Sequence, residues 1–87
     1  MTVYVDAPLW RYGRMKTCHL MADTEEELLE MVDRIGVARK HHQHPGTARS
    51  HFDICLSKRR LALWFGAKEA DSKELVLLMR RKREEGQ

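Results

Sequence analysis

The alternation of apolar and polar residues near the N-terminus predicts two β-strands. Residues 2–5 (TVYV) are rich in β-branched and aromatic side chains. In residues 15–21 (MKTCHLM), alternate side chains fall into two sets that would point to opposite faces, which predicts the second strand. The sets are Lys16, Cys18, Leu20 and Thr17, His19, Met21. Pro8 and Gly13 predict a loop over residues 7–14. Since a parallel crossover generally takes about a dozen residues or more, this short connection favours an antiparallel pair.

Apolar residues at spacings of three and four predict a first helix over residues 23–36. Thr24 and Glu27 fit a capping box at its start, and Gly36 suits a left-handed end. The acidic first turn also complements the helix dipole. The expected apolar face consists of Leu28, Met31, Val32 and Ile35.

A second helix is predicted over residues 57–65. Ser57 is a suitable N-cap for this helix, and Gly66 is a suitable end. The residues expected to face the core are Leu61, Trp64 and Phe65.

A third helix is predicted over residues 71–87. Asp71 and Glu74 fit a second capping box. The expected apolar face consists of Leu75, Leu78 and Met79. Residues 80–87 form a basic and then acidic tail that we expect to fray.

The remaining segments complete the predicted fold. Residues 37–54 are mostly polar around a Pro45–Gly46 turn, and so long a stretch of coil is unusual in a small domain. Short extended pieces, or a hairpin, are therefore expected near residues 37–43 and 50–54, and residues 67–70 predict a short strand or extended link. We predict one domain over residues 1–87, of class α/β with α+β as the alternative. Three helices would pack on a small mixed sheet of three or four strands.

Composition narrows the class of protein. The 87 residues carry a net charge of +3, from 16 basic and 13 acidic side chains, so the overall field is only mildly positive. No apolar run approaches the roughly 18 residues of a membrane span, and the N-terminus does not have the pattern of a signal peptide. We therefore expect a cytoplasmic protein. Cys18 and Cys55 have no paired spacing, which favours two buried or half-buried thiols.

Several short motifs occur in one order along the chain: MTVYVD, HLMAD, RIGV, the Gln of HHQH, SHFD and SKRRLALWFGA. In that order they resemble the bacterial and phage family catalogued as domain of unknown function 4031. The resemblance extends from Met1 to about Leu78 and implies a type of protein rather than a reaction. The recurring polar positions of that family correspond here to Asp6, His19, Asp23, Gln43, His51 and Asp53. This chain departs from the family at Phe52, where tyrosine is usual, and at His42, where an aromatic residue is usual.

The clustered histidines of residues 40–54 raise the question of a metal site. His41, His44, His51 and Asp53 offer nitrogen and oxygen donors with the spacing H-x2-H-x6-H-x-D. Zinc and other transition metals accept such ligands. The sequence has no helical pair of histidines and no thiolate beside them. A divalent metal is therefore an open question, because a sequence cannot show whether donors converge.

A second hypothesis is a small metal-dependent hydrolase or nuclease. Asp6 ends the first predicted strand, where a carboxylate is well placed for catalysis. His19, His51 and Asp53 could join it as bases or ligands. If the first two strands are antiparallel, Asp6 and Asp23 lie at opposite ends of the sheet and cannot share a metal. Whether this protein is an enzyme stays undecided from the sequence.

The leading hypothesis is recognition of a phosphate-bearing ligand at the start of the second helix. Three cations follow Ser57, and cations in a first helical turn oppose the helix dipole. A bound anion or Asp53 would offset them. The proposed ligand-binding residues are Gln43, His51, Ser57, Lys58, Arg59 and Arg60. Nucleic acid or a nucleotide would be the partner, and a third hypothesis is a phage accessory protein that binds a host protein.

Overall fold

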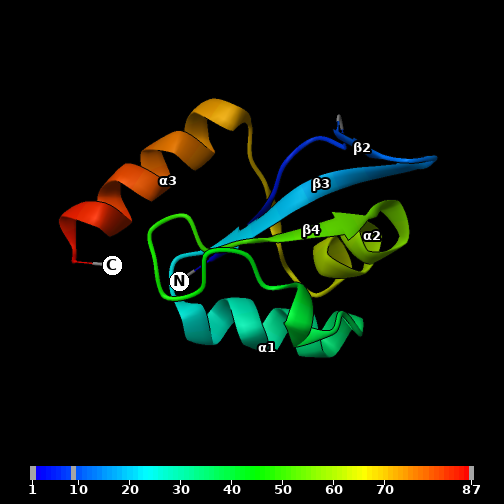
Figure 1. The fold of residues 1–87 in the computed structure, drawn as a ribbon, viewed down its shortest axis with the longest axis horizontal. Helices are drawn as coiled ribbons and strands as arrows, with labels where there is room; N and C mark the ends of the chain where they lie inside the picture. Colours follow the sequence, from blue (N-terminus) through cyan, green and yellow to red (C-terminus); the bar gives the residue numbers. More distant parts are fainter. Residues whose placement is uncertain (1, 9, 87) are drawn as a thin grey trace.

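The structure, a computed structural model, describes residues 2–8 and 10–86. Figure 1 shows the arrangement of its elements. The strands are β1 (Val3–Val5), β2 (Trp10–Tyr12), β3 (Met15–Ala22), β4 (Phe52–Cys55) and β5 (Lys68–Glu69). The helices are α1 (Glu25–Ile35), α2 (Leu56–Trp64) and α3 (Ser72–Glu84), with a short 3₁₀ helix η1 (Arg39–His41).

The strands form one mixed sheet that is four strands wide. β3 pairs antiparallel with β1, β2 and β4, while β5 pairs parallel with β1. Thr17 is paired with both β2 and β4, and Leu20 with both β1 and β4. β1 and β2 therefore share one edge of β3, and β4 lies along the other. This confirms the predicted class, three helices on a small mixed sheet.

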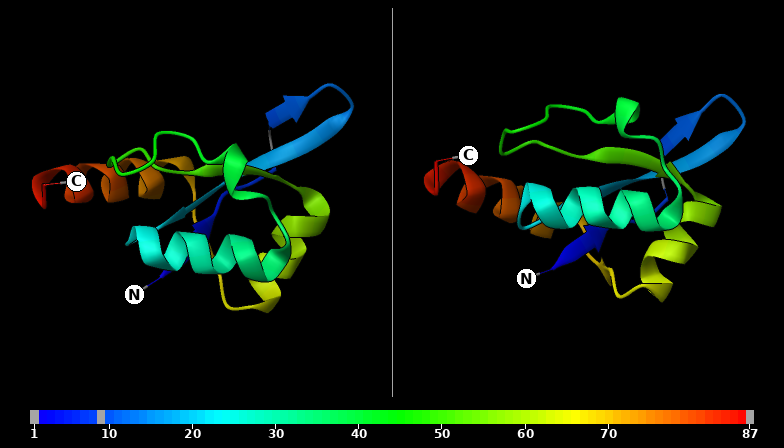
Figure 2. Two further views of the ribbon diagram at one scale, coloured as in Figure 1. Left: turned by 60° about the horizontal axis from the view of Figure 1, so that its bottom comes forward. Right: turned by 90° about the horizontal axis from the view of Figure 1, so that it is seen from below.

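Helices cover the two faces of the sheet unequally. α1 and α2 lie on one face and α3 lies on the other (Figures 1 and 2). The main core joins the sheet to α1 and α2, and its members include Val5, Leu20, Phe52, Leu28 and Ala62. A smaller cluster joins Met21 and Tyr4 to the α3 residues Leu75, Leu78 and Met79. α3 reaches only one end of the second face, and none of the helices in the described part of the chain covers its middle, so we call it the open face.

The apolar spacing of α1 and the caps of α1 and α3 follow the predictions, except that the capping box of α1 is only half formed. Thr24 accepts a hydrogen bond from the Glu27 N–H, but the Glu27 carboxylate accepts from the Thr24 hydroxyl instead of the Thr24 backbone N–H. Gly36 ends α1 with φ 77°. The four predicted apolar residues of α1 are all buried. Asp71 and Glu74 form a complete capping box at the start of α3. The segment at residues 67–70 contains the short strand β5, as expected.

The prediction of a loop over the whole of residues 7–14 was wrong. Trp10–Tyr12 form β2, which pairs with the start of β3 through a two-residue turn. Gly13 supplies the positive φ of 60° that such a tight hairpin requires. Pro8 precedes the strand and does not interrupt its ladder.

The start and the packed face of the second helix were also predicted wrongly. α2 begins at Leu56 with Cys55 as N-cap, so Ser57 is the second helical residue. Its buried residue is Ala62, whereas Leu61, Trp64 and Phe65 are 40%, 83% and 41% exposed. The small Ala62 side chain allows close packing on the core. Arg59, which donates to the Asp6 carbonyl, fixes the rotation of the helix.

The basic end of the third helix is anchored. α3 stays helical to Glu84, through the segment in which fraying was expected. Lys82 is buried and donates to the Ala22 carbonyl, and Arg81 pairs with Asp23 at 2.6 Å. None of the described helices is both long and apolar enough to cross a lipid bilayer.

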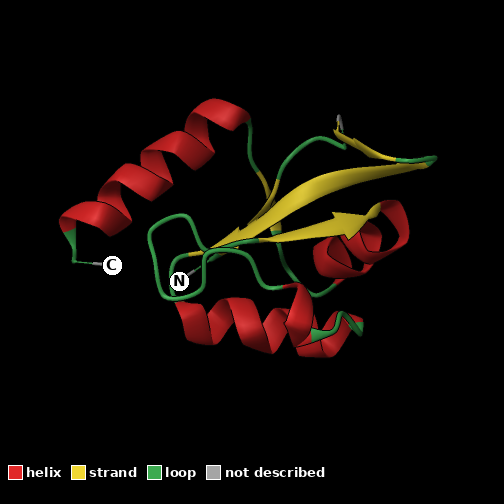
Figure 3. Cartoon of the chain, in the orientation of Figure 1, coloured by secondary structure: helices red, strands yellow, loops and turns green. Residues whose placement is uncertain are grey.

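The polar segment between η1 and β4 is the longest loop of the described chain (Figure 3). Its two ends are joined by a single β-bridge between Gln43 and His51 and by a hydrogen bond between the His42 ring and the Ser50 hydroxyl. The Gly46 N–H donates to Glu25, and the His42 ring stacks on Phe52 at 4.6 Å. These contacts fix the loop to the start of α1 and to the covered face at the start of β4.

Candidate functional site

The strand register brings the candidate residues together on the open face. His19 of β3 is directly opposite Asp53 of β4. His51 lies two residues before Asp53, so strand alternation directs it to the same face. Gln43 is in turn paired with His51. Four polar residues from three parts of the chain therefore meet at one place.

Asp6 holds His19 from the end of β1. The His19 backbone N–H donates to Asp6 Oδ1 at 2.6 Å, and the ring Nδ1 lies 2.7 Å from Oδ2. Asp6 itself is buried. Because a carboxylate only accepts, the proton of a neutral ring lies on Nδ1 and the lone pair on Nε2. Nε2 is the atom that faces Asp53 Oδ1, at 3.8 Å.

His51 is oriented in an equivalent way by the backbone. Its Nδ1 lies 2.7 Å from the Arg49 carbonyl oxygen, which can only accept a hydrogen bond. The lone pair of a neutral ring is therefore on Nε2, and this atom lies 3.6 Å from Asp53 Oδ1. The other oxygen of Asp53 accepts a 2.6 Å hydrogen bond from the Gln43 amide. Each of the three side chains is thus fixed by a partner outside the group.

The three facing atoms are spaced for a divalent cation. One donor atom from each of His19, His51 and Asp53 lies within 4.8 Å of the other two. In a tetrahedral zinc site with bonds of about 2.1 Å, donors lie about 3.4 Å apart. The two histidine–aspartate distances exceed that value by a few tenths of an ångström. All three donors lie within 4.8 Å of one another, so side-chain rotation would have to bring them closer to reach the zinc spacing.

The metal set proposed from histidine spacing is only partly brought together. His51 and Asp53 belong to the cluster, and His19 from β3 takes the place of a loop histidine. The His44 ring is 6.0 Å from the His51 ring and borders the group. His41 is exposed in η1 and lines the adjacent cavity.

The residues proposed for phosphate binding separate into different environments. Arg59 donates to the Asp6 carbonyl and lies 3.5 Å from Glu69, so protein groups already offset its charge. Arg60 is exposed, and Ser57 contacts the Cys55 sulfur at 3.3 Å. Lys58 lines the same cavity as His19 and Asp53. Of the three cations in the first turn, Lys58 is therefore the one beside the site.

Two cavities meet at His19. The larger, about 780 Å³, extends past β4 towards η1 and the start of α2. The smaller, about 260 Å³, lies between the site and α3. Gln43 and Asp53 line the larger cavity, while Asp6 and His51 line the smaller one. The donor cluster therefore forms the boundary between them.

Cys55 is a further chemical group in the larger cavity. It is half-buried at the N-terminus of α2. Hydrogen bonds with the Ser57 hydroxyl and the Lys58 backbone N–H lower the pKa of its thiol from the ordinary value. From the sequence we expected only a buried or half-buried thiol here. The sequence did not show that α2 begins directly after Cys55, which places the thiol at the N-terminus of the helix.

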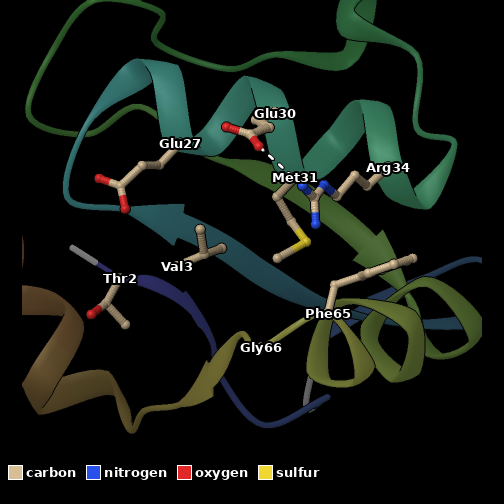
Figure 4. A pocket seen from close by; sticks show the side chains of 8 residues that line it. All are labelled: Thr2, Val3, Glu27, Glu30, Met31, Arg34, Phe65 and Gly66. Carbon is tan, nitrogen blue, oxygen red and sulfur yellow. Dashed lines mark hydrogen bonds and ion pairs between the residues drawn. The ribbon is translucent and has the colours of Figure 1, made fainter.

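Another cavity of about 260 Å³ lies between α1, β1 and the end of α2, away from these residues (Figure 4). Two of its charged side chains, Glu30 and Arg34, pair with each other at 3.2 Å. Arg34 also lies over the Phe65 ring at 5.8 Å. This cavity contains none of the candidate residues.

Asp23 is separated from the candidate site, as expected for antiparallel strands. It accepts hydrogen bonds from the Thr2 backbone N–H and the Tyr4 hydroxyl at the other end of β1. Together with its Arg81 pair, these contacts give it a structural role.

The comparison with known proteins supports the resemblance seen in the motifs. The family model described as "Protein of unknown function (DUF4031)" matches residues 3–82. The curated proteins and the solved structures yield no match to this chain. The matched range includes every residue of the donor cluster.

Proposed function

Because the chain belongs to this family, whose description names no activity, we propose its function from the site: it is a hydrolase that depends on a divalent metal ion. His19, His51 and Asp53 are the ligands. Zinc is the first ion to test, since two histidines and one carboxylate form a common catalytic zinc site.

One observation carries this proposal: each of the three donors has its own outer partner. Asp6 holds His19, the Arg49 carbonyl holds His51, and Gln43 holds Asp53. Carboxylates and backbone carbonyls are the partners that orient metal-binding histidines and fix their tautomer. Exposed histidines in a loop would not need such an arrangement. The pattern is typical of a metal centre with three protein ligands and room for a water molecule.

A zinc ion held by His19, His51 and Asp53 would supply a water molecule whose pKa is lowered to about 7, and so a nucleophile at neutral pH. The water oxygen would form a bond to the phosphorus or carbon of an ester, and the bond to the alcohol would break. The alcohol would take up the proton that the water released, so one water and one ester would give one acid and one alcohol.

A phosphate-bearing ligand keeps a narrower role in this proposal. Lys58 lines the cavity that contains Asp53 and His19, and it would attract an anionic group there. Arg59 is engaged by the Asp6 carbonyl and Glu69, so its charge is already offset, whereas the exposed Arg60 stays a predicted phosphate ligand. Nucleic acid and a host protein stay predictions about the partner.

Zinc titration of chelator-treated protein by calorimetry tests the metal centre. We expect one zinc ion per chain, with affinity reduced at least 100-fold in His51→Ala. His41→Ala is the matched control, because His41 lies on the neighbouring η1 and is not one of the clustered donors. Equal affinity of the wild type and His51→Ala would refute the proposed ligands.

A second measurement tests hydrolysis itself. Zinc-loaded protein should release alcohol from simple phosphate or carboxylate esters, and a chelator should abolish that release. Zinc should restore it in the wild type but not in Asp53→Asn. Bound zinc without turnover of any ester would limit the function to metal binding.

A further inference from the structure

We infer that the substrate is a phosphate ester of a small apolar alcohol. Its phosphate faces the larger cavity, and its alcohol lies in the smaller cavity beside α3, which we call the groove. This inference rests on the proposed hydrolase. It names the substrate class from the two cavities that meet at the donor cluster. A bond cleaved at that boundary would have one half of the substrate on either side.

The smaller cavity has two chemically different ends. Asp6, His19, Arg49 and His51 line the end next to the donors. The residues that line the α3 end are predominantly apolar: Met21, Leu75, Val76 and Met79, with Ser72 beside them. Val76 is 48% exposed there, although it is a β-branched apolar residue. An apolar group attached to the reacting centre would cover this wall.

The size of the groove limits the alcohol. Pockets for complete drug-sized ligands have volumes of about 300–1,000 Å³. The groove, at about 260 Å³, is below that range, whereas the larger cavity at about 780 Å³ is within it. The groove therefore suits an alcohol of one ring or a short chain, and the phosphate belongs on the other side.

The charges on the larger side favour phosphate over a neutral ester. A divalent ion with two neutral histidines and the Asp53 carboxylate has a net charge of +1. Lys58 adds a second positive charge in the larger cavity, whereas the Arg49 cation of the smaller cavity shares its end with the Asp6 carboxylate. A phosphate dianion balances both charges, while a carboxylate ester balances neither before it is cleaved.

The test compares methyl, phenyl and 1-naphthyl phosphate with the zinc-loaded protein, by release of inorganic phosphate. Val76→Asp puts a charge into the apolar wall at a partly exposed position, so the fold should persist. We expect kcat/KM for phenyl and naphthyl phosphate to fall at least tenfold, and that for methyl phosphate to change less than threefold. Ratios of variant to wild type for each substrate remove differences in intrinsic reactivity.

Leu77→Asp is the matched control, because the neighbouring Leu77 is 56% exposed and lies outside the groove. It should leave all three ratios near one. Lys58→Ala should raise KM for every phosphate ester, and exposed Lys73→Ala on α3 should not. Equal losses on all three esters in Val76→Asp would overturn the place of the alcohol.

The failures of this inference and of the hydrolase are distinguishable. Cleavage of phenyl acetate without cleavage of phenyl phosphate would overturn the substrate class and leave the hydrolase intact. Zinc binding with no ester cleaved would overturn both while retaining the metal centre. Absence of zinc binding would refute the centre on which both depend.

Discussion

The two faces of the sheet use alternate residues of the same two strands for different purposes. On the face under α1 and α2, Cys18 and Leu20 of β3 pack against Phe52 and Ile54 of β4. On the other face, His19 and Asp53 stand opposite each other in the part that α3 leaves open. A side-chain period of two lets neighbouring residues serve the core and the site separately.

This difference means that stability and site chemistry can be changed independently. Phe52 and Asp53 are consecutive, yet Phe52 is fully buried and Asp53 is exposed. Substitutions on the covered face should lower the free energy of unfolding. Substitutions on the open face should change metal affinity with little effect on folding.

The largest expected effect is that of Phe52→Ala on the covered face. Truncating a buried phenylalanine costs about 3–5 kcal/mol, because it removes apolar contact and leaves a cavity. A domain of this kind has about 5–15 kcal/mol of stability in total, so the variant should be close to unfolding. Urea denaturation measures the loss. Asp53→Asn without metal is the control and should stay within about 0.5 kcal/mol of the wild type.

The next effect concerns zinc and the open face. An ion that binds only the folded chain adds about 2.7 kcal/mol when its concentration is 100 times Kd. In a domain of this size, that should raise Tm by roughly 10–20 °C. Asp53→Asn should lose this increase while keeping the melting temperature of the metal-free wild type. An equal increase in both proteins would place the zinc elsewhere.

The next prediction concerns Asp6, which follows β1. Its carboxylate holds His19 on the open face, and its backbone carbonyl accepts a hydrogen bond from Arg59 of α2 on the covered face. Asp6→Asn removes the negative charge that holds the His19 Nδ1 proton. Loss of such an outer partner typically costs 10–100-fold in metal affinity, equivalent to about 1.4–2.7 kcal/mol. Calorimetry at low temperature measures this on folded protein. The control is Asp33→Asn, since Asp33 pairs with Arg39 away from the site and should keep full affinity.

Sequence reasoning succeeded where local signals decide the structure. The caps at Thr24 and Asp71 and the glycine stop at Gly36 define α1 and the start of α3 without reference to the rest of the chain. The prediction for α2 was less successful. The packed face of this helix depends on the helix starting directly after Cys55, the last residue of β4, and on the hydrogen bond from Arg59 to the Asp6 carbonyl. Both are tertiary properties that override a weak apolar pattern.

The candidate site shows the same limit. The polar residues could be named from the sequence, but their grouping depends on strand register. Spacing within the loop suggested His41 and His44, whereas the pairing of β3 with β4 brings in His19. The Arg49 carbonyl also has no sequence signal, since any residue supplies that atom.

The smallest expected effect compares the two cysteines. Burial on the covered face, with further contributions from the Asp6 and Asp53 charges, raises the pKa of Cys18 to about 12. On the open face, hydrogen bonds with Ser57 and Lys58 lower the pKa of Cys55. Between about pH 9 and 12, the unfolded chain has therefore lost the Cys18 proton that the folded chain still holds. Stability should fall as pH rises through this window, by at most about 1.4 kcal/mol per pH unit.

Urea denaturation of Cys18→Ala and Cys55→Ala at pH 8.5 and 10.5 isolates this effect. Other groups that titrate in the window, including the buried Lys82, are common to both variants and cancel in the comparison. Cys18→Ala should lose less stability over this interval than the wild type. Cys55→Ala should lose at least as much, because a lowered thiol pKa in the folded state adds stability as pH rises and this variant lacks that gain. If both variants lost stability in parallel, the covered face would not be holding its thiol neutral. The predicted difference in thiol pKa between Cys18 on the covered face and Cys55 on the open face would then be wrong.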